Sequence, residues 1–195
     1  MIQMMKRKLI AMAFLGFAFA LTANAQDDKD DNHTVQINIP EVAILDLEGA
    51  SGTAVVLSVV APKEAGLAVD FSDAKDSSVW MNYSSIVGSS TEPSRVVDAK
   101  ISNGSVPGGM LLKLTAAKDA GNGDGTIGKS SGQITLSGSS QKVVNSIGSC
   151  YTGNGANNGH NLYYSLELDP TAGSYSKIDF DQATTLTILY TISNN

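Results

Sequence analysis

The alternation of apolar and polar residues in short segments separated by turns is the feature that most constrains the fold. Residues 34–39 (TVQINI) alternate with a period of two, which is typical of a half-buried strand. Similar segments recur along the chain, divided by Gly, Asn, Asp, Pro and Ser clusters. The strand candidates are residues 34–39, 42–47, 53–60, 67–71, 79–87, 95–101, 110–114, 133–136, 142–147, 162–168 and 184–192. After residue 25 no segment shows a sustained helical period. The pattern therefore predicts an all-β fold, an antiparallel β-sandwich of immunoglobulin-like or Greek-key type.

The first 25 residues have the pattern of a secretory signal peptide. Residues 6–8 are basic, residues 9–21 are apolar, and residues 23–25 read Ala-Asn-Ala. The apolar run is too short for a transmembrane helix, so we expect no membrane span. The sequence thus predicts a signal peptide over 1–25, a flexible acidic leader over 26–33 and one β-sandwich domain over 34–195. It also predicts secretion to the periplasm, the cell surface or the medium.

The charge of the exported chain limits its partners. Without residues 1–25 the chain keeps 10 basic and 19 acidic residues, a net charge of −9. A chain this acidic is repelled by nucleic acid and by anionic lipid, so neither is an expected partner.

Histidine supply limits the catalytic options, because the chain has only His33 and His160. Neither lies in a nucleophile motif with a serine, and neither forms a zinc-ligand spacing with Cys150. Most acidic residues fall in turns rather than on strands, where a glycosidase would hold its paired carboxylates. We therefore expect no enzyme and no catalytic or cofactor-binding residues. A hydrolase acting through paired Asp or Glu is the least favoured alternative.

One loop carries a partial calcium-binding pattern. The sequence DAGNGDGTI, which starts at Asp119, resembles the Asn-x-Asp-Gly-x-Ile half of a calcium loop. An EF-hand register would place ligating carboxylates at Ala120 and Ser131, so the pattern fails at both ends. A plain Gly/Asn/Asp turn is the favoured interpretation. Weak calcium binding by Asp119, Asn122 and Asp124 is the one cofactor hypothesis.

The chain has one tryptophan and one cysteine, and each leads to a prediction of its own. Trp80 lies in the middle of a predicted strand and is expected to anchor the core between the two sheets. Cys150 is the only cysteine, so no disulfide forms within the chain. We expect it to be a small buried side chain, with an intermolecular bridge as the alternative.

The two ends of the exported chain both read as strands. The last one, residues 184–192, has Leu186, Ile188, Tyr190 and Ile192 on one face, and it is a candidate to join another sheet edge. The alternative is that both terminal strands pair within their own sandwich.

The C-terminal third resembles a known class of exported subunits. It reads NLYYSLELDP…GSYSKIDFDQATTLTILYTIS, with a Leu-x-Tyr-x-Leu strand, a turn region and a Thr-rich last strand containing Tyr190. This pattern is similar to the end of bacterial fimbrial and spore-coat-U-type secreted subunits. The resemblance implies an immunoglobulin-like sandwich whose copies polymerise by strand exchange.

Two functions are consistent with these observations. The first is an exported, non-enzymatic structural or adhesive protein of the bacterial cell surface or extracellular space, in its most specific form a fimbrial-type subunit. Its partner would be a second copy or another protein, joined through the terminal strands. The alternative is a soluble extracytoplasmic binding module for carbohydrate or calcium. For carbohydrate, stacking faces are expected from the tyrosines at 83, 151, 163 and 164, the last two on opposite sides of one strand.

Overall fold

The computed structural model describes residues 29–195, so the predicted signal peptide and the first three leader residues lie outside the described part. Two units are distinguished along the chain, Met1–Asn38 and Ile39–Asn195. In the first unit, residues 29–38 are exposed and belong to no strand or helix. The second unit contains every strand of the described chain.

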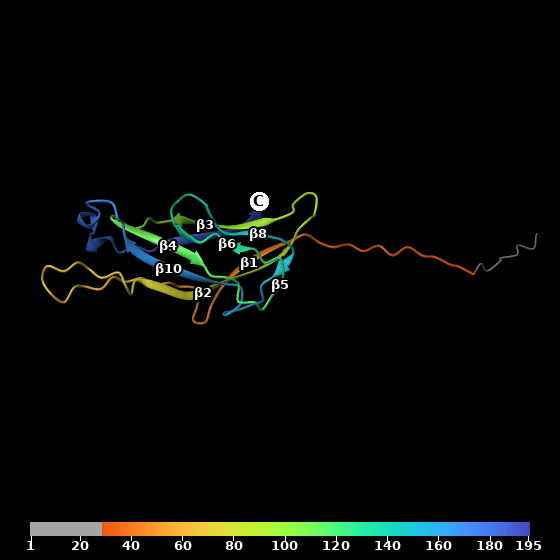
Figure 1. Cartoon of the computed structure of the whole chain (residues 1–195), viewed down its shortest axis with the longest axis horizontal. Coiled ribbons are helices and arrows are strands. Elements are labelled where there is room, and N and C mark those ends of the chain that lie inside the picture. Colours follow the sequence, from red (N-terminus) through yellow and green to blue (C-terminus); the bar gives the residue numbers. More distant parts are fainter. Residues whose placement is uncertain (1–28) are drawn as a thin grey trace, which may run out of the picture. The chain divides into compact units, whose positions relative to one another are not determined.

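The second unit consists of two antiparallel sheets, which Figure 1 shows as two layers. The first sheet contains β1 (Val42–Gly49), β2 (Lys75–Ile86), β4 (Met110–Ala116), β5 (Asp124–Gly125), β7 (Gln133–Thr135), β9 (Cys150–Tyr151) and β10 (His160–Leu168). The second contains β3 (Arg95–Asn103), β6 (Lys129–Ser130), β8 (Gln141–Ile147) and β11 (Thr187–Asn194). Two short 3₁₀ turns, η1 (Tyr175–Lys177) and η2 (Phe180–Gln182), precede β11. The prediction of an all-β antiparallel sandwich is confirmed.

The strand order brings sequence-distant segments together. The first sheet runs β5-β9-β2-β10-β4-β7, with β1 also paired to β2, and the second runs β11-β3-β8-β6. Because β9 pairs with the end of β2 and β10 with its beginning, the loop between β9 and β10 lies along one edge of β2. Strand β1 occupies the opposite edge and has no further partner strand among the described residues.

The core lies between the sheets and follows the alternation of the strands. Its fully buried members include Met81 of β2, Leu114 of β4 and Val144 of β8. Tyr164 of β10 and Tyr190 of β11 join the two sheets through their hydroxyls, which are 2.6 Å apart. This bond satisfies two buried polar atoms that would otherwise weaken the core.

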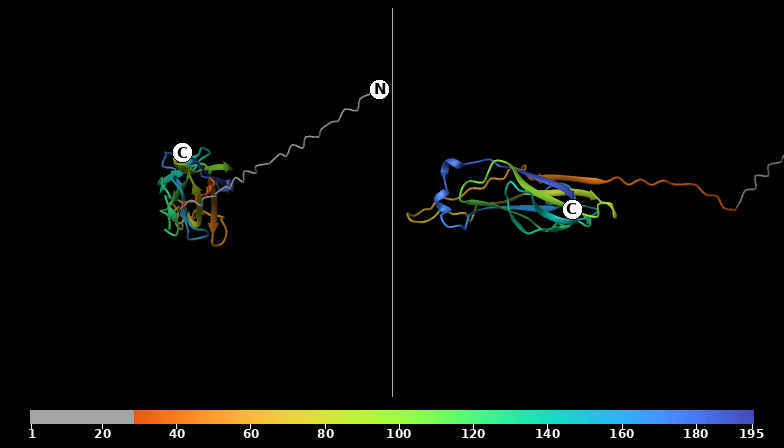
Figure 2. Two further views of the ribbon diagram at one scale, coloured as in Figure 1. Left: turned by 90° about the vertical axis from the view of Figure 1, so that its right-hand side faces the viewer. Right: turned by 90° about the horizontal axis from the view of Figure 1, so that it is seen from above.

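Three expected strands do not form ladders. Residues 34–39 are exposed along their whole length, although their alternation predicts a half-buried strand. Residues 53–60 and 67–71 share only the isolated bridge between Val60 and Asp70. The chain turns at Gly52, which has a φ of 98°, and residues 53–59 no longer pair with β2. Figure 2 shows this part of the chain running to the same end of the sandwich as η1, where the Val69 amide donates to the Tyr175 hydroxyl.

The expectation that Trp80 anchors the core is wrong. Its neighbours Val79 and Met81 are buried in the core, so alternation along β2 turns Trp80 to the outer face of the first sheet. There it is half-buried between its register partners Glu48 and Asn161.

We predict that Leu114→Ala lowers the free energy of unfolding by about 2–5 kcal/mol, because it removes a fully buried side chain and leaves a cavity. Trp80→Ala is the matched comparison on the outer face and should cost about 2 kcal/mol or less. Urea unfolding of both variants measures the two values. A larger loss for Trp80→Ala than for Leu114→Ala would contradict this assignment of the core.

Candidate functional site

Residues 53–59 form an extended segment without a partner strand. They make no backbone hydrogen bond with any residue of the described chain. Their burial alternates, since Val55 and Leu57 pack against the core whereas Val56 is 77% exposed. The segment therefore has the side-chain pattern of a sheet strand while its amide and carbonyl groups are left without protein partners. We call it the unpaired segment.

Residues 34–39 are a second exposed apolar stretch, which we call the N-terminal segment. Val35, Ile37 and Ile39 are 69%, 80% and 74% exposed, and all three occupy alternate positions that fall on one face of an extended chain. Three large apolar side chains at this spacing are unusual on a protein that has no partner.

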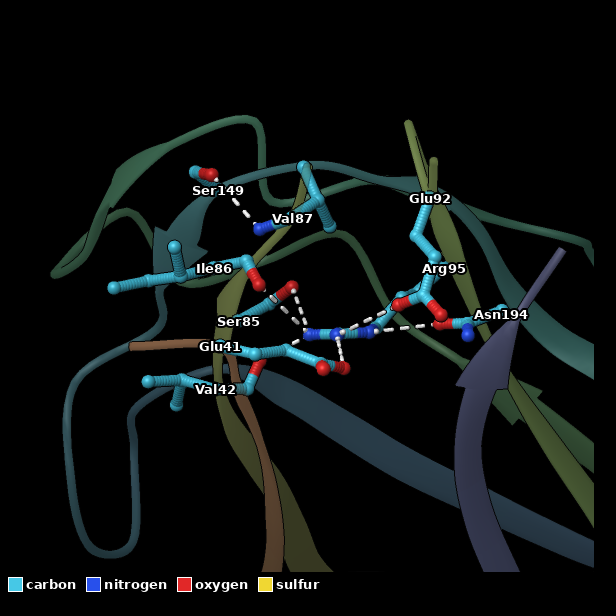
Figure 3. A network of polar contacts seen from close by, with 9 residues as sticks. All are labelled: Glu41, Val42, Ser85, Ile86, Val87, Glu92, Arg95, Ser149 and Asn194. Carbon is cyan, nitrogen blue, oxygen red and sulfur yellow. Dashed lines mark hydrogen bonds and ion pairs between the residues drawn. The ribbon is translucent and has the colours of Figure 1, made fainter. Parts of the chain in front are cut away.

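The buried guanidinium of Arg95, on β3 of the second sheet, bonds to the start of β1 and to β2 in the first sheet and to β11 in its own sheet. Its side chain is 1% exposed. Nη1 donates to the carbonyl of Val42 on β1, to Ser85 Oγ at 3.3 Å and to the carbonyl of Ile86 at 3.2 Å. Nε donates to Asn194 Oδ1 on β11 at 3.2 Å. Figure 3 shows these contacts converging on one side chain from three other strands.

Two carboxylates neutralise this buried charge. Glu41 Oε1 lies 2.5 Å from Arg95 Nη2, and Glu92 Oε2 lies 3.6 Å from the same nitrogen (Figure 3). A buried guanidinium without such partners would be strongly unfavourable. Because Glu41 directly precedes β1, its ion pair also fixes the point at which the chain enters the sandwich.

A second polar cluster lies around His160, which is 1% exposed. His160 Nδ1 lies 2.8 Å from the carbonyl of Ala117, which only accepts, so this nitrogen carries a hydrogen. His160 Nε2 lies 2.8 Å from the hydroxyl of Tyr83, whose ring stacks on the imidazole. The same hydroxyl also lies against the carbonyl of Ile127, so its single hydrogen serves only one of these two acceptors.

Burial controls the protonation of this cluster. Desolvation lowers the pKa of His160, although the bond to Ala117 and the charge of Asp119 act in the opposite direction. Desolvation also raises the pKa of Tyr83, with smaller contributions from Cys150 and Asp119. The neutral forms are therefore favoured, which suits a role in packing better than a role in proton transfer.

Each of the three calcium candidates makes a hydrogen bond, and the second oxygen of Asp119, Oδ1, is buried without a partner among the described residues. Asp119 Oδ2 accepts from the amide of Gly121, Asp124 Oδ1 accepts from the amide of Gly125, and Asn122 Nδ2 donates to the carbonyl of Asn157. Among residues 29–195 no group of three or more His, Cys, Asp or Glu side chains is arranged to hold a metal ion. Calcium binding at Asp119, Asn122 and Asp124 stays a prediction.

The structure sorts the remaining candidates by burial. Cys150 is a free, buried thiol, as expected, and desolvation raises its pKa to about 11, with a further contribution from Asp119. Such a thiol is a poor nucleophile for an intermolecular bridge. Tyr83 and Tyr164 are buried and offer no stacking face, whereas Tyr151 and Tyr163 are exposed. Tyr163 and Tyr164 do point to opposite sides of β10, as predicted.

Sequence reasoning missed Arg95 and assigned His160 no structural role. The histidine is the first residue of β10. Arg95 occurs at the start of a predicted strand, where an exposed position is the ordinary expectation for arginine. The one available signal was that Val97, Ala99 and Ile101 share a face, because the same alternation places Arg95 on that inward face.

No protein-family model matches the chain, and comparisons with curated proteins and with solved structures gave no match. Within residues 29–195, no helix has the length and apolar character needed to cross a membrane.

We predict that Arg95→Ala lowers the free energy of unfolding by about 3–5 kcal/mol, because it leaves buried carbonyls and two carboxylates without their donor. Lys100→Ala, on the same strand but half-buried, should change it by about 0.5 kcal/mol or less. Urea unfolding of both variants measures this difference. A loss for Arg95→Ala below about 1 kcal/mol would show that the network does not hold the strands together.

We also predict that the folded state loses stability as the pH falls from about 7.5 to about 5.5. The pKa of His160 is lower in the folded state than in the unfolded chain. As the pH falls below the unfolded pKa, the unfolded chain takes up a proton that the folded state does not, so the free energy of unfolding decreases. Denaturant unfolding across this range measures the slope. His160→Gln should flatten it, whereas His33→Gln, at an exposed position, should leave it unchanged. Equal slopes in wild type and His160→Gln would contradict the assignment.

Proposed function

We propose that the chain is an exported, non-enzymatic structural or adhesive protein of the cell surface or extracellular space that assembles through its sheet edges. The single observation that carries this proposal is the unpaired segment, residues 53–59. It has the alternating burial of a strand and no backbone partner among the described residues. Unpaired backbone groups on an extended apolar segment are a template for addition of a strand from another chain.

The N-terminal segment of a second copy has the properties required of the added strand. Its length of six residues is close to the seven of the unpaired segment. Its three exposed apolar side chains would be buried on one face, each contributing about 1.5–3 kcal/mol before the costs of association. Main-chain hydrogen bonds would supply the remaining affinity, as in other cases of strand addition.

The length of the connection argues for a second copy as the source of the added strand. Pro40 and Glu41 join the N-terminal segment to Val42, the first residue of β1. The unpaired segment follows the other end of β1, since Gly49 pairs with Val79 and Val60 bridges Asp70 beyond the start of β2. Strand β1 has eight residues and spans about 25 Å, whereas a connection of two residues reaches about 7 Å.

The C-terminal strand is already paired within the sandwich, although it is an edge strand of the second sheet. Strand β11 pairs with β3 along its whole length, and Tyr190 is buried in the core, so donating β11 to another copy would break these contacts. Of the two terminal segments, the N-terminal one is therefore the better candidate for donation to another copy.

We predict that the chain beginning at Gln26 forms concentration-dependent oligomers, and that Ile37→Asp raises the concentration needed for association at least about tenfold. The added charge would lie on the buried face of the strand pairing. Light scattering behind a sizing column measures the mass distribution. The matched control is Asn38→Asp, which adds the same charge at the neighbouring position on the opposite face and should associate like the wild type.

A peptide of residues 33–41 gives an independent readout. It should bind to a chain that begins at Ile39 and lacks most of its own N-terminal segment, whereas the same peptide with aspartate in place of Ile37 should not. A monomer at all concentrations together with no binding of the peptide would refute assembly through this segment. Oligomers that Ile37→Asp leaves intact would place the contact elsewhere on the sandwich.

A further inference from the structure

The outer face of the first sheet carries a groove beside Tyr151. Ile44 on β1, Ser84 on β2 and Tyr151 on β9 are register neighbours, so their side chains form one row across three strands on the same face. Ile44 is 64% exposed and Tyr151 is 54% exposed, and the small Ser84 side chain lies between them. The row therefore has two apolar walls and a polar floor.

A hollow lies on each side of this row. One has a volume of about 400 Å³ and extends from Ser84 and Tyr151 towards Val42 and Asp124. The other has a volume of about 390 Å³ and extends from the same two residues towards Asp46. The two hollows share Ser84 and Tyr151, so an elongated ligand would cross the tyrosine ring at its middle.

The lining of the hollows indicates which ligand they fit. Neither is lined by Lys, Arg or His, which disfavours an anionic ligand. Polar acceptors line both hollows, since Asp46 and Asp124 each use Oδ1 for the amide of the following residue and make no hydrogen bond through Oδ2 with any described residue. Asn154, exposed in the loop after β9, adds an amide side chain to the second hollow.

Further aromatic side chains lie on the same outer face. Trp80 precedes Ser84 by four residues on β2, so both side chains lie on the same face of the strand. Tyr163 of β10 is 38% exposed. Aromatic rings stack on apolar ligand faces, and carboxylate and amide groups accept from hydroxyls. We propose that this face binds a neutral oligosaccharide, with one sugar ring on Tyr151 and the hydroxyls of the rings on either side of it on Asp46 and Asp124.

This site is separate from the proposed assembly contact. It lies on the face of the first sheet, whereas strand addition uses the backbone of residues 53–59, and neither hollow is lined by any of those residues. The two proposals can therefore fail independently.

The test is an NMR titration of the chain beginning at Gln26 with cellohexaose, maltohexaose, chitohexaose and xylohexaose at millimolar concentration. At least one saccharide should shift amide signals at residues 44–46, 82–84 and 151. Tyr151→Ala should weaken that binding at least about tenfold. Ser84→Phe, which fills the groove and keeps Tyr151, should abolish it. Phe180→Ala removes an exposed aromatic outside this face and should bind normally.

Three results would overturn the proposal. The first is the absence of localised shifts with all four saccharides. The second is binding that survives both Tyr151→Ala and Ser84→Phe, in variants whose thermal unfolding shows that they remain folded. The third is a shift of the same signals by the peptide of residues 33–41 and by none of the saccharides, which would make the groove a protein contact.

Discussion

The ion-pair and hydrogen-bond network of Arg95 is the interaction on which the arrangement of the strands depends. One buried guanidinium bonds to β1, β2 and β11 from its own position on β3, so it joins the ends of both sheets. Its charge requires Glu41 and Glu92, and Glu41 lies immediately before β1. The sandwich therefore begins at the residue that neutralises its buried charge, and the residues before Glu41 are not required for this network.

The start of the sandwich at Glu41 leaves the N-terminal segment outside the network of Arg95. Residues 34–39 have the composition of a strand but precede the point at which the chain is held. Residues 53–59 have the burial of a strand but follow the turn at Gly52 that separates them from β2. Neither segment makes a backbone hydrogen bond to another described residue, so each offers its donors and acceptors to an added strand. We infer that pairing between copies satisfies both.

The alternation of apolar and polar residues was enough to predict the all-β fold class, but it did not predict which strands pair with one another. Alternation identifies a strand's two faces but not which face is inward, and Trp80 shows the resulting error because Val79 and Met81 are the core residues. Alternation also does not say whether a neighbouring edge is free, so residues 34–39 and 53–60 read like strands that do pair. The outward row at Ser84 depends on register across three strands, which no local pattern contains. His160 and Arg95 were hidden because their polar groups bond to carbonyls distant in the sequence, those of Ala117 and Val42.

Hydrogen exchange at the amides of residues 53–59 tests the central claim most directly. In the monomer these amides have no acceptor among residues 29–195 and should exchange rapidly, at rates near those of an unstructured chain. In oligomers of the chain beginning at Gln26, alternate amides of the segment should become protected, together with those of residues 34–39. Rapid exchange at residues 53–59 in both states, or protection already present in the monomer, would contradict the account.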